Sequence, residues 1–312
     1  MSCLKGTKYL SRTGFCENVT LTLSIGTRGS KLAYAQSEIV QKALFELGIE
    51  STLKIIRTSG DSFIDRPFRD AGIGAFVREI DEIMLTGDVD IAVHSMKDIP
   101  TIRPPELEIA AVLPRASPFD VLVSENPLHD GAIIGTSSLR RRAQLARYYP
   151  QYRATDIRGN VDTRLKKLRK GEFDGIILAE AGMERLEIDI KKQKLPFIPS
   201  PNQGIIAVVS RKDTEAYTVL RKLNHDATMI EGTAERIIME VLGGGCVVPM
   251  GVFAQLHNNE VRVAAEVLSQ GGDKAVILNE VMPKNDYMRH AKKFGKKLQE
   301  CGGAQLIAEV LK

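Results

Sequence analysis

The chain contains no tryptophan, and its 312 residues include few cysteines and histidines. The four cysteines, Cys3, Cys16, Cys246 and Cys301, lie far apart and form no C-x-x-C pair, which excludes a disulfide framework and a cysteine-based zinc site. The five histidines show no metal-ligand spacing, so we predict no metal. Cysteine usage of this kind predicts a reducing compartment, and we expect the protein in the cytoplasm.

Long apolar runs and a strong excess of charge are also absent. No apolar stretch approaches the roughly 20 residues of a membrane-spanning helix. Residues 1–18 have no apolar core, which argues against a secretory signal and leaves the role of this tail open. The net charge is only +4, and no aromatic residues interleave with the basic run Arg140–Arg142. We therefore expect no nucleic-acid partner and no membrane partner.

Strand-like and helix-like segments alternate along the first two thirds of the chain. The expected strands are 21–25, 53–57, 90–94, 121–124, 132–134, 155–157, 175–179 and 205–210, and the expected helices are 32–47, 76–85, 139–148 and 161–169. This alternation predicts α/β units with parallel sheets, and the layout restarts after Pro114–Pro118. From about residue 226 the order changes to a helix, three strands and two helices, which indicates a small α+β domain.

The expected domain limits follow from these changes. Domain 1 takes residues 19–114 and 203–223, domain 2 takes 115–202, and domain 3 takes 226–312. In the third domain we expect helices at 227–242, 286–300 and 304–311 and strands at 252–256, 261–267 and 274–281, with turns at Asn258–Asn259 and Gly271–Gly272.

Polar, often basic clusters follow several strands of the two α/β units. In open α/β sheets ligands bind outside the carboxyl ends of the strands, where helix N-termini offer free N–H groups. The basic residues of these clusters are Arg28, Lys97, Arg140, Arg141, Arg158, Arg164 and Arg185. Together they predict a cavity for an anionic ligand, because the arginine fork suits carboxylates. The alternative for any one of them is a solvated surface charge.

Two further features are candidates for chemistry. Asp98 follows Lys97 directly, and a carboxylate among cations ionises easily and can transfer protons; the alternative is a turn-capping aspartate before Ile99–Pro100. Cys246 follows Gly243–Gly245 and precedes Pro249. A thiol in a small, stiff corner suits covalent attachment; the alternative is a glycine-capped helix end with a small buried cysteine.

Six motifs in order give this chain its resemblance to a known family. They are Ile25–Ala33 with Gln36, Asp90–Pro100, Gly135–Arg141, Arg158–Leu165, Ala179–Leu186 and Gly244–Gly251. From about Leu23 to its C-terminus the chain resembles hydroxymethylbilane synthases, also called porphobilinogen deaminases. The resemblance implies two doubly wound α/β domains similar to periplasmic binding proteins, with the active-site cleft between them, and a small C-terminal α+β domain. It also implies a monomer.

The resemblance further implies a reaction and a cofactor. Dipyrromethane would be held on Cys246 by a thioether, and four porphobilinogen units would be added in turn, each losing ammonia, before water releases hydroxymethylbilane. Asp98 would protonate the departing amine and then stabilise positive charge on pyrrole nitrogens. The other cofactor-binding residues would be Lys97, Ser95, Thr136, Ser138, Arg140, Arg141, Arg164, Arg185 and Gln203. The substrate-binding residues would be Arg28, Gln36, Ser30, Arg158, Arg164 and Arg185.

The chain departs from the commoner family pattern at a few positions. Ile73 and Arg78 replace lysines in and after a stretch expected to form a lid over residues 62–74, and Asn202 stands where glycine is usual. Two other functions also fit the anion cavity. A two-lobed binding protein for a small anion would leave Cys246 and the third domain unexplained, and a phosphate-ligand transferase is disfavoured because no P-loop is present.

Overall fold

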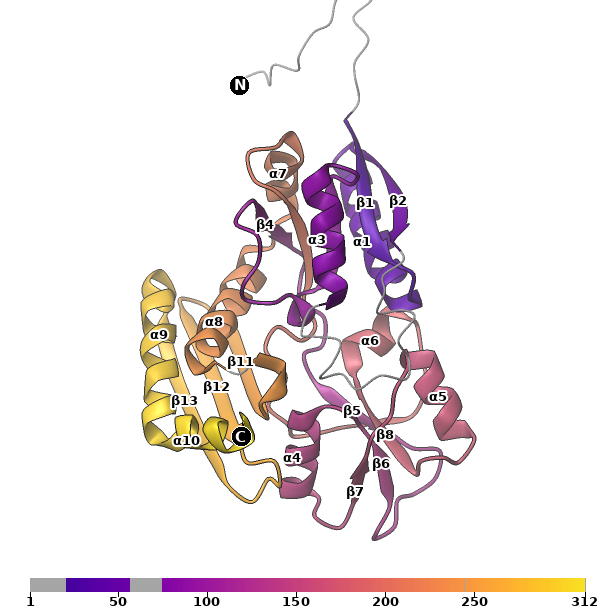
Figure 1. Cartoon of the computed structure of the whole chain (residues 1–312), viewed down its shortest axis with the longest axis vertical. Coiled ribbons are helices and arrows are strands. Elements are labelled where there is room, and N and C mark those ends of the chain that lie inside the picture. The colour runs from indigo at the N-terminus through magenta and orange to yellow at the C-terminus, as the bar shows by residue number, and fades with distance from the viewer. Residues whose placement is uncertain (1–20, 57–74, 244, 312) are drawn as a thin grey trace, which may run out of the picture.

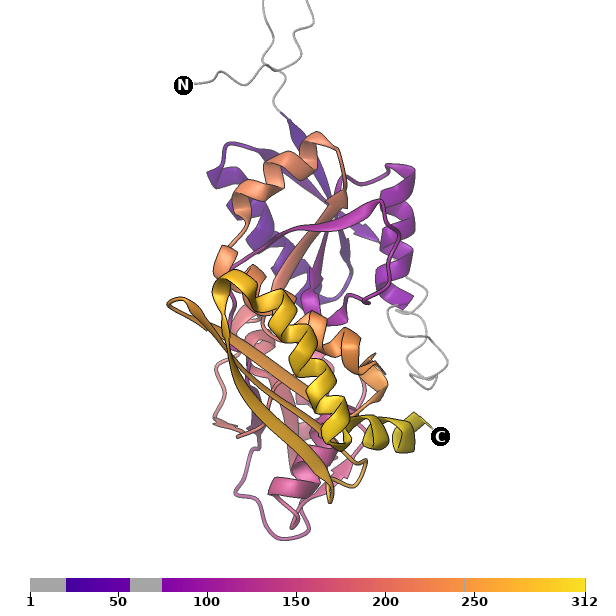
Figure 2. The ribbon, with the colours of Figure 1, turned by 90° about the vertical axis from the view of Figure 1, so that its left-hand side faces the viewer.

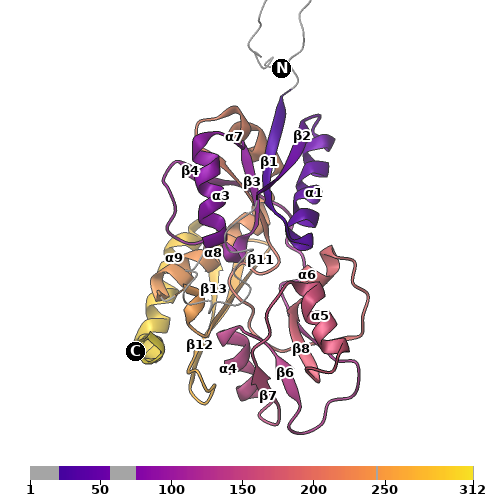
Figure 3. The same ribbon diagram turned by 45° about the vertical axis from the view of Figure 1, so that its right-hand side comes forward.

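The described part of the chain forms three β-sheets, each built from a different portion of the sequence (Figure 1). The computed structural model describes residues 21–56, 75–243 and 245–311. The tail 1–18 and the expected lid at residues 62–74, with Ile73, therefore lie outside the described residues. In Figure 3 the first sheet lies above the second, and the third unit lies beside both.

The first sheet has the strand order β2-β1-β3-β10-β4. Its strands are β1 (Thr22–Arg28), β2 (Glu50–Ile56), β3 (Ile91–Ser95), β4 (Leu107–Val112) and β10 (Ile206–Arg211). Helices α1 (Lys31–Glu46) and α7 (Glu215–Leu220) pack on one face through Val40, Leu44 and Leu220. Helix α3 (Ala75–Thr86) packs on the other face through Ile80 and Met84.

The second sheet repeats this plan in the order β7-β6-β8-β5-β9. Its strands are β5 (Asp120–Val123), β6 (Ile133–Gly135), β7 (Arg153–Thr155), β8 (Gly175–Ala179) and β9 (Lys192–Lys194), and its helices are α4 (Leu139–Tyr148), α5 (Val161–Arg169) and α6 (Glu180–Arg185). Leu145 of α4 packs on one face, and Leu165 and Leu168 of α5 pack on the other. The prediction of two α/β units is confirmed.

The prediction of parallel sheets needs one correction, because one inner strand of each sheet runs antiparallel to its neighbours. β10 is antiparallel to β3, and β5 is antiparallel to β8. Both strands enter their sheets directly after the chain has crossed from the other unit. Their first residues therefore lie at the edge where the parallel strands end: Ile206 pairs with Ser95, and Asp120 pairs with Ala179. The residues that precede these two strands consequently belong to the ligand-binding edge.

The third unit is an antiparallel meander covered by helices, as expected. β11 (Met250–His257), β12 (Glu260–Leu268) and β13 (Ala275–Pro283) lie in sequence order. Asn258 and Gly272 have positive φ in the two turns. Helices α8 (Asp226–Leu242), α9 (Tyr287–Leu298) and α10 (Ala304–Leu311) share one core with the strands, and Figure 2 shows α9 crossing over them.

Candidate functional site

Two crossover segments, residues 113–119 and 199–205, connect the first and second sheets and lie against each other. The Ala116 amide donates a hydrogen bond of 3.1 Å to the Gly204 carbonyl. Gly204 has φ +89°, and a Cβ there would lie 2.5 Å from the Ala116 carbonyl oxygen, so glycine is required for this approach. Asn202, where glycine is usual, has φ +62°, a conformation that asparagine tolerates better than most residues.

The Lys97–Asp98 pair lies on a 3-10 turn, Met96–Asp98, at the end of β3. The Met96 amide donates to the Ile205 carbonyl at 2.9 Å, and the Met96 side chain is buried, which anchors the turn to the second crossover. Lys97 is half-buried and Asp98 is exposed. The predicted proton donor is therefore accessible to a ligand, while its neighbour belongs to the wall of the site.

Lys97 contacts a buried network that includes two predicted arginines. Its Nζ donates to Gln203 Oε1 at 3.3 Å, and Gln203 Nε2 donates to Asp120 Oδ1 at 3.0 Å. Arg141 donates to the same oxygen from Nε and Nη2 at 3.0 and 2.7 Å. Arg140 Nη1 lies 2.7 Å from Asp120 Oδ2. The structure thus joins four predicted site residues through Asp120, which the sequence did not single out.

The N-terminus of α4 brings further predicted residues to this place. Ser138 caps the helix, and its hydroxyl accepts a hydrogen bond from the Arg141 amide. Thr136 is fully buried, and its hydroxyl accepts from the Ser138 amide at 3.3 Å. A ten-residue helix that starts here presents the positive end of its dipole to an anion.

Ser95 and Gln36 form a separate pair on the first unit. Gln36 Nε2 donates to Ser95 Oγ at 2.9 Å, and Gln36 is buried. Ser30 caps α1 and accepts a hydrogen bond from the Ala33 amide at 3.3 Å. Among the described residues no hydrogen bond or ion pair links the side chains of these three to the Asp120 network, so the pair and the network are distinct parts of the predicted site.

The remaining predicted arginines are all half-buried. Arg185 Nη2 donates to the Gly204 carbonyl at 2.6 Å, and Arg164 Nε donates to the Gly159 carbonyl at 2.8 Å. Burial lowers the pKa of Arg185 to about 10, and burial together with the nearby charge of Arg141 lowers the pKa of Arg164 to about 10. Both side chains stay cationic at neutral pH. Arg28 is the last residue of β1, and Arg158 directly follows the buried Ile157. Both positions agree with the prediction that the basic residues lie near the ends of strands.

Cys246 lies between α8 and β11, in the 3-10 turn Gly245–Val247. Helix α8 is capped at its C-terminus by Gly243, which has φ +72° and whose amide donates to the Met239 carbonyl. The glycine-capped helix end is therefore present, and a cap of this kind is compatible with either interpretation of Cys246. The Cys246 side chain lies outside what the structure describes.

A second buried carboxylate, Glu235 of α8, was also missed by sequence reasoning. Arg115 of the first crossover donates to it from Nη1 at 2.7 Å, and the Asn202 amide of the second crossover also donates to it. The Asn202 side chain donates to the Gly232 carbonyl at 2.9 Å. The only local signal was a charged residue on the apolar face of a helix. Such a signal does not show which distant residues pair with the charge.

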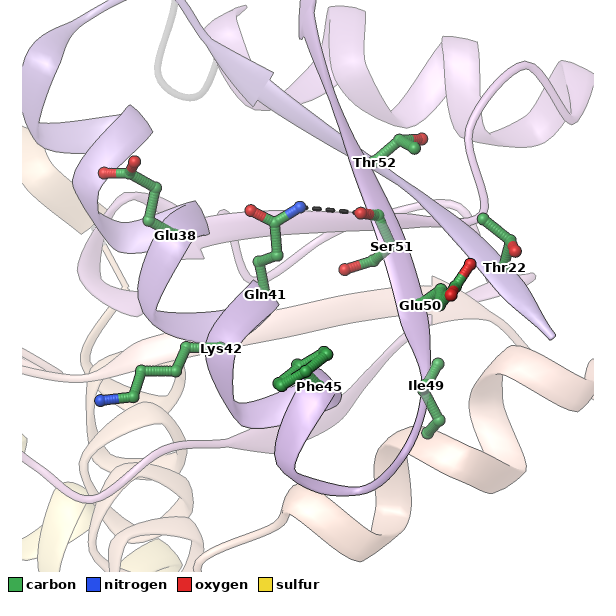
Figure 4. A pocket seen from close by; sticks show the side chains of 9 residues that line it. All are labelled: Thr22, Glu38, Gln41, Lys42, Phe45, Ile49, Glu50, Ser51 and Thr52. Atoms are coloured by element: carbon green, nitrogen blue, oxygen red, sulfur yellow. Dashed lines mark hydrogen bonds between the residues drawn. The ribbon is translucent and has the colours of Figure 1, made fainter. Parts of the chain in front are cut away.

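A pocket on the outer side of the first sheet does not belong to this site. It lies between α1 and β2, where Gln41 Nε2 donates to the Ser51 carbonyl at 2.8 Å (Figure 4). None of the predicted site residues lines it. In residues 21–56, 75–243 and 245–311, no cluster of three potential metal ligands occurs, and no helix is long and apolar enough to cross a membrane.

Comparisons with known proteins match nearly the whole chain. The family model described as "Porphobilinogen deaminase, dipyromethane cofactor binding domain" matches residues 23–218, and "Porphobilinogen deaminase, C-terminal domain" matches residues 229–301. A probable porphobilinogen deaminase of Methanococcoides burtonii is 50% identical over 298 residues, covering 92% of this chain and 96% of its own length. One from Methanocella arvoryzae is 50% identical and covers 93% and 99%.

Solved binding proteins are also similar to part of the chain at low sequence identity. The methionine-binding protein MetQ is 12% identical with a TM-score of 0.43, and the alignment covers 65% of this chain and 89% of that one. A putative methionine-binding lipoprotein from Bacillus subtilis is 14% identical with a TM-score of 0.40 and covers 65% and 90%. Scores this low support no conclusion about what this chain binds.

Proposed function

Because the chain belongs to the porphobilinogen deaminase family, we propose that it joins four porphobilinogen molecules stepwise into linear hydroxymethylbilane, releasing ammonia, on a dipyrromethane primer attached to Cys246. The chain is a transferase that makes hydroxymethylbilane for porphyrin biosynthesis, and its cofactor is dipyrromethane. The observation that carries the proposed mechanism is the exposed Asp98 beside half-buried Lys97, at an edge shared with buried arginines.

The donor groups at this edge fit the chemistry of the cofactor. Dipyrromethane carries carboxylate side chains, which guanidinium groups and helix N-termini bind well. We assign its binding to Cys246, Lys97, Ser95, Thr136, Ser138, Arg140, Arg141, Arg164, Arg185 and Gln203. When bound, the cofactor supplies the pyrrole end to which substrate is joined. The cationic residues hold it in place, and the Cys246 thiol tethers it.

Asp98 acts as the acid of the site in this proposal. Its exposed carboxyl can reach a bound amine, give it a proton so that ammonia leaves, and then face the positive charge that develops on the pyrrole. Incoming porphobilinogen is held by Arg28, Gln36, Ser30, Arg158, Arg164 and Arg185. Arg164 and Arg185 serve both sets, and their charge at neutral pH supports this role.

The proposal extends to the organisation of the protein. We assign residues 19–114 with 203–223 to domain 1, 115–202 to domain 2 and 226–312 to domain 3, and the membership of the three sheets supports this division. The protein acts as a cytoplasmic monomer on a small-molecule substrate, without nucleic acid or membrane.

Intact-protein mass spectrometry tests the covalent primer. The purified protein should carry the added mass of two linked pyrrole units, and Cys246→Ser should remove this mass together with ammonia release from porphobilinogen. Cys301→Ser is the matched control, because Cys301 is an exposed cysteine of the same domain, and it should keep both.

An unmodified Cys246 in fully active protein would contradict the tethered primer. Reversible binding of porphobilinogen without ammonia release would instead indicate a binding protein and overturn the proposed reaction.

A further inference from the structure

Asp120 is a fully buried carboxylate at the ligand-binding edge to which the proposed reaction gives no role. It is the first residue of β5, directly after the first crossover. Removing a charge from water costs several kcal/mol unless the charge is paired and hydrogen-bonded. The groups that pair with Asp120 come from two separate parts of the chain, α4 and the second crossover.

The two arginines of α4 use Asp120 differently. Arg141 donates from Nε, Nη1 and Nη2, to Asp120 and to the Ile177 carbonyl, so each of its nitrogens has a protein acceptor. The hydrogen bonds that Arg140 makes to other described residues all come from Nη1, to Gln144 and to the Ile198 carbonyl. Asp120 and its neighbours therefore hold Arg141 as part of the frame, and Arg140 keeps Nε and Nη2 for a ligand.

Asp120 also determines which way the Gln203 amide points. Gln203 Nε2 has two acceptors, the Pro118 carbonyl at 2.8 Å and Asp120 Oδ1 at 3.0 Å. Two acceptors on one side of an amide require its NH₂ group there, so Oε1 faces the opposite side. On that side Oε1 accepts the hydrogen bond from Lys97. The orientation of the amide thus carries the influence of Asp120 from the second sheet to the turn that bears Asp98.

We propose that Asp120 is a positioning residue, which holds Arg140 through their direct ion pair and Lys97 through Gln203, in the geometry that binds anionic substrate. The expected effect on turnover of porphobilinogen rests on the proposed function, whereas the expected effect on the protonation of Lys97 does not. Asp120 contacts no reacting atom in this assignment; it acts through the side chains that do.

The charges around Lys97 supply a readout that is independent of turnover. Burial lowers the pKa of Lys97, Arg141 and Arg140 lower it further, and Asp98 and Asp120 raise it. Burial alone would raise the pKa of Asp120, but Arg140, Arg141 and Gln203 hold it well below its usual range. Asp120 therefore stays ionised at neutral pH and favours the protonated form of Lys97.

Asp120→Asn, which keeps the size of the side chain, tests the proposal. The rate at which acetic anhydride modifies Lys97 is followed against pH by peptide mass spectrometry, with the cofactor content of each sample recorded. We expect the midpoint for Lys97 to move down by about one pH unit, because a nearby negative charge is lost. The kcat/KM for porphobilinogen should fall about 100-fold, mainly through KM, because misplaced binding groups lose ligand affinity.

Two variants separate positioning from general stability. Asp81→Asn breaks another buried aspartate–arginine pair, with Arg103, and should leave the Lys97 midpoint unchanged. Gln203→Met leaves the two arginines of α4 on Asp120 but removes both the acceptor of Lys97 and one donor to Asp120, and it should lower the midpoint even where Asp120→Asn does not fold.

An unchanged Lys97 midpoint in folded Asp120→Asn, or in Gln203→Met where the aspartate variant does not fold, would overturn the proposal. If the unaltered protein fails to make hydroxymethylbilane while the midpoints shift as expected, the proposed function fails and the positioning network stands.

Discussion

His94, one residue before the end of β3, is a buried imidazole inside the HSMKD motif. Its Nε2 has no hydrogen-bond partner among the residues that the structure describes. Burial, together with the charges of Arg103 and Arg28, lowers the pKa of His94 from 6.5 to about 3. The imidazole is therefore neutral at physiological pH, which is consistent with the proposal that Asp98 is the acid of this motif.

This buried histidine should make stability depend on pH. In the unfolded chain His94 takes up a proton near pH 6.5, but in the folded chain only near pH 3. The contribution of neutral His94 to the free energy of unfolding is therefore complete above pH 6.5 and is lost as pH falls towards 3. The slope is about 1.4 kcal/mol per pH unit, or about 5 kcal/mol over the full range. In urea titrations between pH 6.5 and 4, His94→Gln should reduce the slope of the free energy of unfolding against pH by the amount that corresponds to one proton. Parallel curves for the two proteins would contradict this assignment.

At the scale of elements, α4 links the second sheet to the third unit. Gln144 in its middle donates to the Ile198 carbonyl at 2.8 Å and to Glu266 of β12. The turn between β12 and β13 lies against the same helix, where Gly272 approaches the Ala143 carbonyl. Glu266 is fully buried, and burial raises its pKa although Gln144 and two arginines oppose the shift. Helix α4 thus contacts the buried carboxylate of Glu266 through Gln144, which also accepts a hydrogen bond from Arg140 of the site.

Replacing Glu266 by glutamine should stabilise the protein at alkaline pH. The raised pKa means that the folded state disfavours the ionised form of Glu266. The loss of folding stability caused by this carboxylate is therefore absent at low pH and grows as pH rises above 4.5, the pKa of the unfolded chain. Glu266→Gln keeps an acceptor for Gln144 and should gain about 1–2 kcal/mol at pH 8 but little at pH 4.5, measured by urea unfolding. Glu260→Gln, at the exposed start of the same strand, should change neither value. A loss of stability at pH 8 would contradict the prediction.

At the scale of the whole molecule, Glu235 ties together both crossovers and the third sheet. Besides Arg115 and the Asn202 amide, it accepts a hydrogen bond of 2.7 Å from the Ala254 amide of β11. Arg115 also donates to the Gln203 carbonyl at 3.0 Å and lies over the Phe253 ring. The two crossovers between the α/β units are therefore held by a side chain of the unit that bears Cys246.

Glu235→Gln should lower the free energy of unfolding of the whole protein. It leaves the buried Arg115 guanidinium without its counter-charge, and the loss of one partner of a buried pair typically costs about 3–5 kcal/mol. Thermal and urea unfolding should both show the loss. Glu231→Gln, which removes a more distant carboxylate 3.8 Å from Arg115, should cost much less. Equal losses in the two variants would show that Glu235 has no special role.

Local sequence patterns predicted the helices and strands whose signals lie within one short segment of the chain. The helices Leu139–Tyr148, Val161–Arg169 and Ala304–Leu311 begin and end where the sequence indicated, because an apolar face of period 3.6 is a property of a short segment. The short β4, β9, α6 and α7 were missed. β1 was also longer than expected and runs on through Gly26 to Arg28 because it pairs with β2.

The sequence by itself determined the family, the α/β and α+β units, and the set of cationic residues at the strand ends, because these depend on residue types at fixed short spacings. Only the tertiary structure decided how that charge is compensated. Asp120 lies 21 residues from Arg141 and 83 from Gln203 along the chain, and they meet because β5 and β10 enter their sheets in the antiparallel direction. The partner of a buried charge depends on strand order and direction, and those are properties of the assembled sheets rather than of any local pattern.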